Sequence, residues 1–298
     1  MSTTESLSDK HPLPRDGSIK FSAGPHVYRY NGVPVRKSVT GLLKKFFPPF
    51  DAAKVIEAHY DQWKQNKASK YSALIKYLTL VQGRNEAFCK GAIRALWQAD
   101  GKQASEEGTR MHLDFECIVN GRLPPQGETR EVTLFRRWLT AFCTELDVEP
   151  FRSELIVYCL HKGRVLVAGQ VDLVLKAKTQ DVYYCVDYKR KDPTERFPGR
   201  GQNLLGVDVS GFGDEEGTGP FEGIPADDFY KYCAQLNIYA HIAASEYGID
   251  FRDNLYLLQI HPSLEQAHTV TCARMDDRME ALFALERNAM EAEAEAPL

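Results

Sequence analysis

The spacing of apolar residues changes along this chain, and the changes predict its elements. From residue 51 to about residue 103 apolar residues recur with helical spacing. Between residues 151 and 189 they form apolar runs separated by polar turns, which is typical of strands buried on both faces. The predicted order is a hairpin at 26–35, a helix from Ser38 or Thr40 to Phe47, helical residues 51–103, helices at 108–121 and 132–146, strands at 151–161, 165–175 and 181–189, a helix at 230–247, a strand at 255–260 and a last helix at 276–293.

This order predicts an α/β fold of the α+β kind, with a central mixed β-sheet flanked by helices and a helical N-terminal region. We expect a disordered N-terminus at 1–20, a hairpin and helical region at 21–105, a core at 106–290 and a tail at 291–298. Residues 193–228 interrupt the core and are rich in Gly, Pro and Asp. A loop of that length is usually functional or disordered, and we favour disorder.

Composition places the chain among ordinary globular proteins, with 298 residues, 43% hydrophobic and 26% charged. No apolar run approaches the roughly 20 residues that a membrane-spanning helix needs. The N-terminus has no apolar core for a signal peptide, and it carries acidic residues with little arginine. We therefore expect an intracellular protein, cytoplasmic or nuclear, without a membrane partner.

Neither the charge nor the cysteines identify a ligand. The net charge of -4 leaves nucleic-acid binding open, because binding depends on local patches. The seven cysteines are dispersed without a CxxC pair, so buried free thiols are expected rather than a zinc or iron–sulfur site. Four basic clusters are either binding patches or solvated faces: Arg36-Lys37, Lys44-Lys45, Arg136-Arg137 and Lys189 to Lys191.

The strongest chemical signal lies on two successive predicted strands. Asp172 lies in the first strand, and the second ends with Asp187 and Lys189. Side chains two residues apart on a strand share a face, so Asp187 and Lys189 point the same way and Tyr188 points into the opposite layer. Mg²⁺ prefers oxygen ligands, and a neighbouring lysine suits hydrolysis of a phosphodiester. A surface hairpin with scattered charges is the alternative, but the apolar neighbours favour a site.

Other polar residues gain meaning only in combination. His112 and Glu116 are four residues apart on a predicted helix and share a face, as do Gln235 and Tyr239 on a later one. Glu154 lies near the start of the first core strand. Taken singly, each is expected to be a packed or surface residue.

In sequence order these residues resemble the motifs of the PD-(D/E)XK nuclease superfamily. The similarity is greatest to the branch that holds RecB-type nuclease domains, lambda exonuclease and the mitochondrial genome maintenance exonuclease. It spans roughly residues 36–260 and includes Ser38-Val39-Thr40 and the Asp-Gln-Trp-Lys segment at 61–64. It implies a restriction-endonuclease-like core at 106–290. The matching positions are Gly108 and His112, Glu154, Gly169 and Asp172, Asp187 and Lys189, and Gln235 and Tyr239.

The resemblance implies one or two Mg²⁺ or Mn²⁺ ions. Asp172 and Asp187 would bind the first ion, and the main-chain carbonyl of Tyr188 would complete its shell. His112 would be a further ligand of that ion. Glu154 would hold a second ion. Glu116 lies outside the tightest motif.

The resemblance also implies roles around the ions. Lys189 would position or activate the attacking water. Gln235 would orient that lysine or contact the backbone, and Tyr239 would support its helix or touch a phosphate. Arg190 and Lys191, with Tyr239, are the expected nucleic-acid contacts.

The expected function is metal-dependent hydrolysis of DNA, with an exonuclease on ends or single strands favoured. The alternatives are a structure-specific endonuclease of the same fold and a protein that binds nucleic acid without cleaving it. Only Cys272 follows the QxxxY helix, so no iron–sulfur cluster is expected. The chain has no GxxxxGK[ST] motif, so any helicase or recombination partner would be a separate chain.

Overall fold

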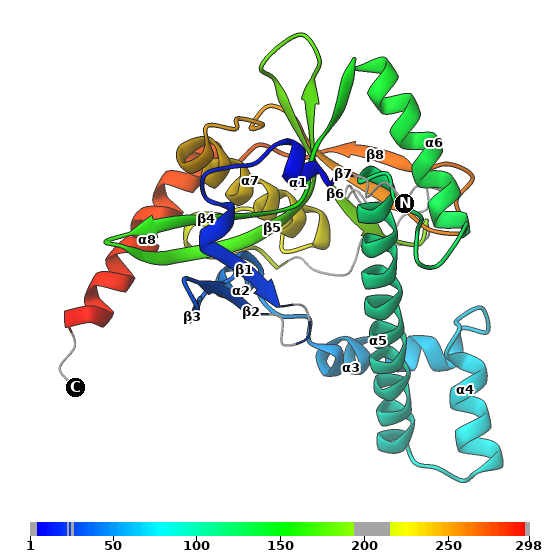
Figure 1. Ribbon diagram of the computed structural model, residues 1–298. Coiled ribbons are helices and arrows are strands. Elements are labelled where there is room, and N and C mark those ends of the chain that lie inside the picture. Colours follow the sequence, from blue (N-terminus) through cyan, green and yellow to red (C-terminus); the bar gives the residue numbers. More distant parts are fainter. Residues whose placement is uncertain (1–4, 23, 25–26, 194–214, 296–298) are drawn as a thin grey trace. The chain divides into compact units, whose positions relative to one another are not determined.

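The computed structural model describes residues 5–22, 24, 27–193 and 215–295 (Figure 1). The chain divides into two compact units. We call residues 1–48 with 110–298 the core unit, and residues 49–109 the helical unit. The predicted boundary at 105/106 therefore lies close to the second junction, whereas residues 21–48 belong to the core unit and not to the helical region.

A five-stranded sheet forms the centre of the core unit, and its order along the sheet is β4-β5-β6-β7-β8. The pair β6 and β7 is parallel and the other neighbours are antiparallel, so the prediction of a mixed sheet is confirmed. The sequence pattern missed β8, which is short. The strands are β4 (Val148–His161), β5 (Arg164–Ala177), β6 (Tyr183–Arg190), β7 (Leu255–Ile260) and β8 (His268–Thr271).

Helices cover both faces of this sheet, as predicted. On one face the apolar cluster joins the strands to α2 (Val39–Leu43), α7 (Asp228–Tyr247) and α8 (Asp276–Glu295). On the other it joins them to α6 (Arg130–Glu145) and the last turns of α5 (Glu86–Val119). Alternation along β6 separates the two layers, because Cys185 belongs to the first cluster and Val186 to the second.

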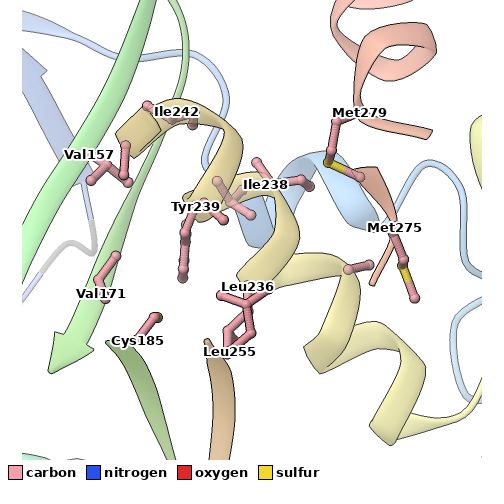
Figure 2. Packing of buried hydrophobic residues seen from close by; sticks show 14 of the residues in the cluster. Val157, Val171, Cys185, Leu236, Ile238, Tyr239, Ile242, Leu255, Met275 and Met279 are labelled. Atoms are coloured by element: carbon pink, nitrogen blue, oxygen red, sulfur yellow. The ribbon is translucent and has the colours of Figure 1, made fainter. Parts of the chain in front are cut away.

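The parallel pair of strands requires a crossover, and α7 supplies it between β6 and β7. Asp227 caps its first turn by accepting from the N–H of Tyr230, and Gly248 ends it with a φ of 67°. Figure 2 shows Leu236, Ile238, Tyr239 and Ile242 of α7 among apolar side chains of the strands and of the Met275–Met279 segment.

Gly169 on β5 allows α7 to approach the sheet closely. A Cβ atom at this position would lie 2.3 Å from Cε1 of Tyr239 and 3.0 Å from Cγ2 of Val39. Only a residue without a side chain fits between the strand and the tyrosine ring. The glycine of the GxxD motif is therefore explained by packing.

The N-terminal residues are ordered, so the prediction of disorder is wrong for residues 5–20. The N–H of Leu7 donates to Oδ1 of Asn120 (2.8 Å), and Arg152 donates to both carboxylate oxygens of Asp16. These long-range bonds were not visible in a polar sequence. Residues 1–4 lie outside the described part. The elements are α1 (Leu7–Lys10), η1 (Asp16–Ser18) and a small sheet of β1 (Ile19–Ser22), β2 (Val27–Tyr30) and β3 (Val33–Pro34).

The expected disorder of 193–228 is also wrong for residues 215–228, while residues 194–214 lie outside the described part. A short helix, η3 (Gly219–Phe221), brings the Phe221 ring to 5.1 Å from that of Phe47. Phe221 is fully buried, and the N–H of Thr218 donates to the carbonyl of Phe46 (2.7 Å). Burial of this aromatic ring stabilises the segment despite its glycines.

The helical unit has its own small core. It contains α3 (Ala52–Gln65), α4 (Ser72–Lys76), a π-helical turn labelled η2 (Tyr77–Val81) and the first part of α5. Trp97 Nε1 donates to the hydroxyl of Tyr71 (2.6 Å) beside Trp63. The predicted break at Gly83 is confirmed, because this residue lies between η2 and α5, outside both, and has a φ of 62°. The predicted break at Gly101 and the predicted helix start at Gly108 are wrong, because α5 continues through both.

Two expectations from composition have structural counterparts. Five of the seven cysteines are buried, as predicted for thiols within apolar runs. No helix in the described ranges is both long and apolar enough to cross a membrane.

We expect Gly169→Ala to destabilise the core unit by about 1–3 kcal/mol, because the added methyl group overlaps the Tyr239 ring. Urea unfolding followed by circular dichroism measures the change. Gly17→Ala is the matched control, since its Cβ meets nothing within 4 Å, and it should change stability by less than about 1 kcal/mol. Equal small effects in both variants would show that the ring moves aside at little cost.

Candidate functional site

Three residues of the predicted set form a compact group of metal-ligand atoms. One nitrogen of His112 and one carboxylate oxygen each of Glu154 and Asp172 all lie within 4.8 Å of one another. They lie on three different elements: His112 on α5, Glu154 on β4 and Asp172 on β5. Asp172 is buried, whereas His112 and Glu154 are partly exposed, so the group is reachable from solvent.

The strand register explains why the two carboxylates meet. The pairs Ser153–Leu173 and Leu155–Val171 flank them and place Glu154 opposite Asp172. Glu154 also has a φ of 49°, in the left-handed region that non-glycine residues seldom adopt inside a strand. Such a conformation costs about 1–3 kcal/mol and is typical of functional sites. The spacing of residues in the sequence does not predict this conformation of Glu154.

Tyr188 connects this group to β6. Its N–H donates to Oδ2 of Asp172 (2.7 Å), and its carbonyl oxygen lies 3.2 Å from Nε2 of His112. Nδ1 of the same imidazole lies 3.5 Å from Oδ1 of Asp172. The Tyr188 ring points into the opposite layer, as predicted, where it meets Phe115 and Phe135 edge to face.

Charge repulsion and burial shift the pKa values of the group. Burial disfavours the charged imidazole, but the Asp172 carboxylate outweighs it and raises the pKa of His112 to about 9. Burial raises the pKa of Glu154 to about 8, and the charge of Asp172 adds to that rise. Burial also opposes the charge of Asp172, yet His112 keeps its pKa below the usual value. Burial and the neighbouring Asp172 thus keep a proton on Glu154 at a pH where a free glutamate has lost it.

Asp187 and Lys189 form an ion pair beside this group and are not part of it. Burial raises the pKa of Asp187 to about 6, although Lys189 opposes the rise. Burial disfavours the ammonium of Lys189, but Asp187 outweighs it and raises the lysine's pKa. Its Nζ also lies 4.3 Å from the ring centre of Tyr232 on α7. The lysine is thus held as a cation between a carboxylate and an aromatic face.

The arrangement differs from the one that the family resemblance implies. Glu154, expected on a second ion, lies with His112 and Asp172, whereas Asp187, expected with them, is paired with Lys189. Glu116 lies near Arg122, at 3.7 Å, and is outside the group of ligand atoms.

The predicted nucleic-acid contacts are already engaged within the chain. Arg190 Nε donates to Glu131 (3.1 Å), and Lys191 Nζ donates to Asp228 (2.6 Å). Tyr239 is only 3% exposed, and its hydroxyl accepts a hydrogen bond from Gln235 (2.7 Å). Its position suits support of α7, the first of its two expected roles, and leaves little access for a phosphate.

Two further residues near the site escaped the sequence analysis. Tyr232 precedes Gln235 by three residues on α7, so helical spacing from the QxxxY motif indicates it. Gln259 is fully buried on β7 opposite Lys189, and its amide donates to the carbonyls of Lys191 and Asp192. A single glutamine in an otherwise apolar strand was the available signal.

The donor set fits a divalent cation with oxygen preference. Two carboxylates, an imidazole and an adjacent main-chain carbonyl match the ligands of Mg²⁺ or Mn²⁺. A cation would also counteract the burial and the Asp172 charge that together raise the pKa of Glu154. His112, Glu154 and Asp172 are the residues that would hold it.

Comparisons with known proteins leave the family open. No family model and no curated protein match the chain. A solved structure titled "Crystal structure of SSO0001" aligns at 12% identity and a TM-score of 0.22. The alignment covers 51% of this chain and 57% of that one, so the chain spans little more than half of its length. A similarity of this size carries no argument about fold or function.

We expect Asp172→Asn to raise the Kd for Mn²⁺ more than the roughly 10–100-fold that loss of a second-layer partner costs. The reason is that the change removes one of the two carboxylate charges in the group. Electron paramagnetic resonance of free Mn²⁺ measures the binding. Asp181→Asn, which alters an exposed carboxylate paired with Lys176, is the matched control and should bind like the parent. An unchanged Kd in Asp172→Asn would rule out this site.

We expect the affinity for Mn²⁺ to rise as the pH increases from 6 to 8. In the metal-free protein Glu154 and His112 hold protons below pKa values of about 8 and about 9, and a metal must displace them. Each released proton contributes up to roughly tenfold in Kd per pH unit. Calorimetry in two buffers of different ionisation enthalpy counts the protons. Glu154→Gln should release about one proton fewer, and a pH-independent Kd would contradict the proposed ligands.

Proposed function

We propose that this chain is a metal-dependent nuclease that hydrolyses phosphodiester bonds in DNA, with a core of the restriction-endonuclease type. The proposal rests on one observation: His112, Glu154 and Asp172 converge next to the Asp187–Lys189 pair. These five residues come from four elements, and the motif order of the PD-(D/E)XK superfamily names all of them. Residues that merely pack in the core or lie on the surface would have no reason to lie next to one another.

The chain's own residues would divide the work as follows. A bound Mg²⁺ or Mn²⁺ would polarise the scissile phosphate and lower the pKa of a bound water. Lys189 is held as a cation by Asp187, so it would donate hydrogen bonds and stabilise negative charge developing on the phosphate. A protonated lysine does not accept a proton, which argues against Lys189 as the general base.

The surrounding residues would keep Lys189 in place. The Tyr232 ring lies beneath its ammonium, and Gln259 binds the main chain just after β6. Gln235 is tied to Tyr239 on the same helix face and would hold the orientation of α7 toward the sheet. Water exclusion and positioning of this kind contribute to catalysis by fixing the reacting groups.

We expect Lys189→Ala and Asp187→Ala each to lower the cleavage rate of DNA in Mg²⁺ or Mn²⁺ by at least about 100-fold, the usual cost of losing a transition-state donor. Release of label from end-labelled DNA measures the rate, and circular dichroism checks that each variant is folded. Lys178→Ala removes an exposed lysine paired with Asp147 and should retain full activity. If the Lys189 and Asp187 variants cut as fast as the parent, the assignment fails.

The same assay separates the alternatives. An exonuclease degrades linear DNA and spares covalently closed circles, whereas an endonuclease opens the circles. Parent protein that binds DNA in Mn²⁺ without cutting either substrate would replace the proposal with a binding function.

A further inference from the structure

Carboxylates compensate most of the cations in the core unit that the sequence grouped into basic clusters. Glu286, which is buried, pairs with both Lys37 (2.8 Å) and Lys45 (3.1 Å). Compensated cations of this kind attract a polyanion weakly. The other pairs are Arg36 with Glu293, Arg136 with Glu128, Lys189 with Asp187, Arg190 with Glu131 and Lys191 with Asp228.

One segment of the helical unit shows the opposite pattern, although Lys90 elsewhere in that unit is paired with Glu57 and Glu86. Residues 62–85 contain five lysine or arginine residues and no aspartate or glutamate, in a chain of net charge -4. All five cations are exposed, and none forms an ion pair with a carboxylate in the part of the chain that the structure describes. We call residues 62–85 the basic stretch. Its cations are Lys64, Lys67, Lys70, Lys76 and Arg84.

Large apolar side chains are exposed within and beside the basic stretch. On the π-helical turn, Leu80 is 80% exposed, Val81 70% and Tyr77 52%. Phe88, at the start of α5, is 47% exposed, and the Arg84 guanidinium lies 4.6 Å from its ring centre. Tyr71 and Leu78 are buried in the small core of this unit. The four exposed apolar residues are not part of that core.

We propose that this surface of the helical unit binds single-stranded DNA. The five cations would neutralise phosphates, and Tyr77 and Phe88 would stack on bases. Single-stranded nucleic acid is the polyanion that also offers free base faces, whereas a duplex keeps its bases stacked inside. The combination of exposed cations outside ion pairs with exposed aromatic rings therefore favours a single strand over a duplex.

The choice of DNA rests on the proposed function, but binding needs neither metal nor cleavage. Fluorescence anisotropy of labelled oligo-dT in EDTA measures it directly on the full chain. We expect a Kd that rises steeply with salt. In the triple variant Lys67→Gln, Lys70→Gln, Lys76→Gln, the slope of log K against log salt should fall in magnitude by about 2, at about 0.7 per lost phosphate contact. At 0.1 M salt this corresponds to roughly 100-fold weaker binding.

A second triple variant controls for net charge. Lys10→Gln, Lys20→Gln, Lys102→Gln removes the same charge from exposed lysines outside the basic stretch and should bind within about twofold of the parent. Equal losses in the two triple variants would overturn the proposal. Tyr77→Ala with Phe88→Ala should weaken binding to single strands at least about tenfold and leave binding to a duplex unchanged, because only free bases stack.

Two further experiments test which class of ligand this surface binds. A duplex of the same length should bind more weakly than oligo-dT, and stronger duplex binding would overturn the choice of a single strand. Vesicles with anionic lipid should not compete with oligo-dT for the parent protein. If they do compete, and the Lys67, Lys70, Lys76 variant no longer binds the vesicles, the surface is assigned to a membrane instead.

The outcomes separate this inference from the proposed function. If the parent cleaves DNA and the triple variant of the basic stretch binds oligo-dT as tightly as the parent, only the inference is overturned. If the parent does not cleave DNA and the triple variant loses oligo-dT binding, only the nuclease assignment is overturned. Asp172→Asn should lose cleavage and keep oligo-dT binding, since its carboxylate lies in the core unit.

Discussion

The candidate site depends on holding two facing carboxylates close together, Asp172 buried and Glu154 partly exposed. Like charges at such a distance raise one another's pKa unless positive charge lies between them. Asp172 accepts a hydrogen bond from the Tyr188 N–H and lies beside the His112 imidazole, whereas the pKa of Glu154 stays raised by burial and by Asp172, although His112 opposes the rise. Two acids held this close are costly to bury in the metal-free fold, and a bound cation, as proposed, would offset that cost.

Tyr188 connects the aromatic layer of the core to this site. Its ring is locked among Phe115 and Phe135 in one layer, while its main chain holds Asp172 and faces His112 on the other. Phe115 follows His112 by three residues on α5, so the same helix face supplies both the anchor and the imidazole. A shift in the aromatic layer would therefore move the ligand atoms.

Charge is organised differently in the basic clusters of the core unit and in the basic stretch. In the core unit most cations of these clusters are paired with acids, Lys189 with Asp187 among them. In the basic stretch the five cations are exposed and form no ion pair with a carboxylate of the described residues. Cations of the second kind are the more available to a polyanion, as the proposed binding surface requires.

The sequence by itself determined the types of most elements, because apolar spacing marks strands and helices directly. The order of its motifs also singled out His112, Glu154 and Asp172, whose ligand atoms the fold brings within 4.8 Å of one another. Continuity of α5 through Gly108 was not predictable, since helix breaks at glycine depend on context that a single sequence lacks. The order of the N-terminus depends on long-range hydrogen bonds such as that from Leu7 to Asn120.

Only the tertiary structure decided which acids share a ligand group. Strand register sets Glu154 opposite Asp172, the left-handed backbone at Glu154 aims its side chain, and the Lys189 ammonium draws Asp187 aside. Each depends on atoms brought together from distant parts of the chain, and motif order does not encode their distances. The sequence thus determined which residues take part, and the fold decided how they are paired.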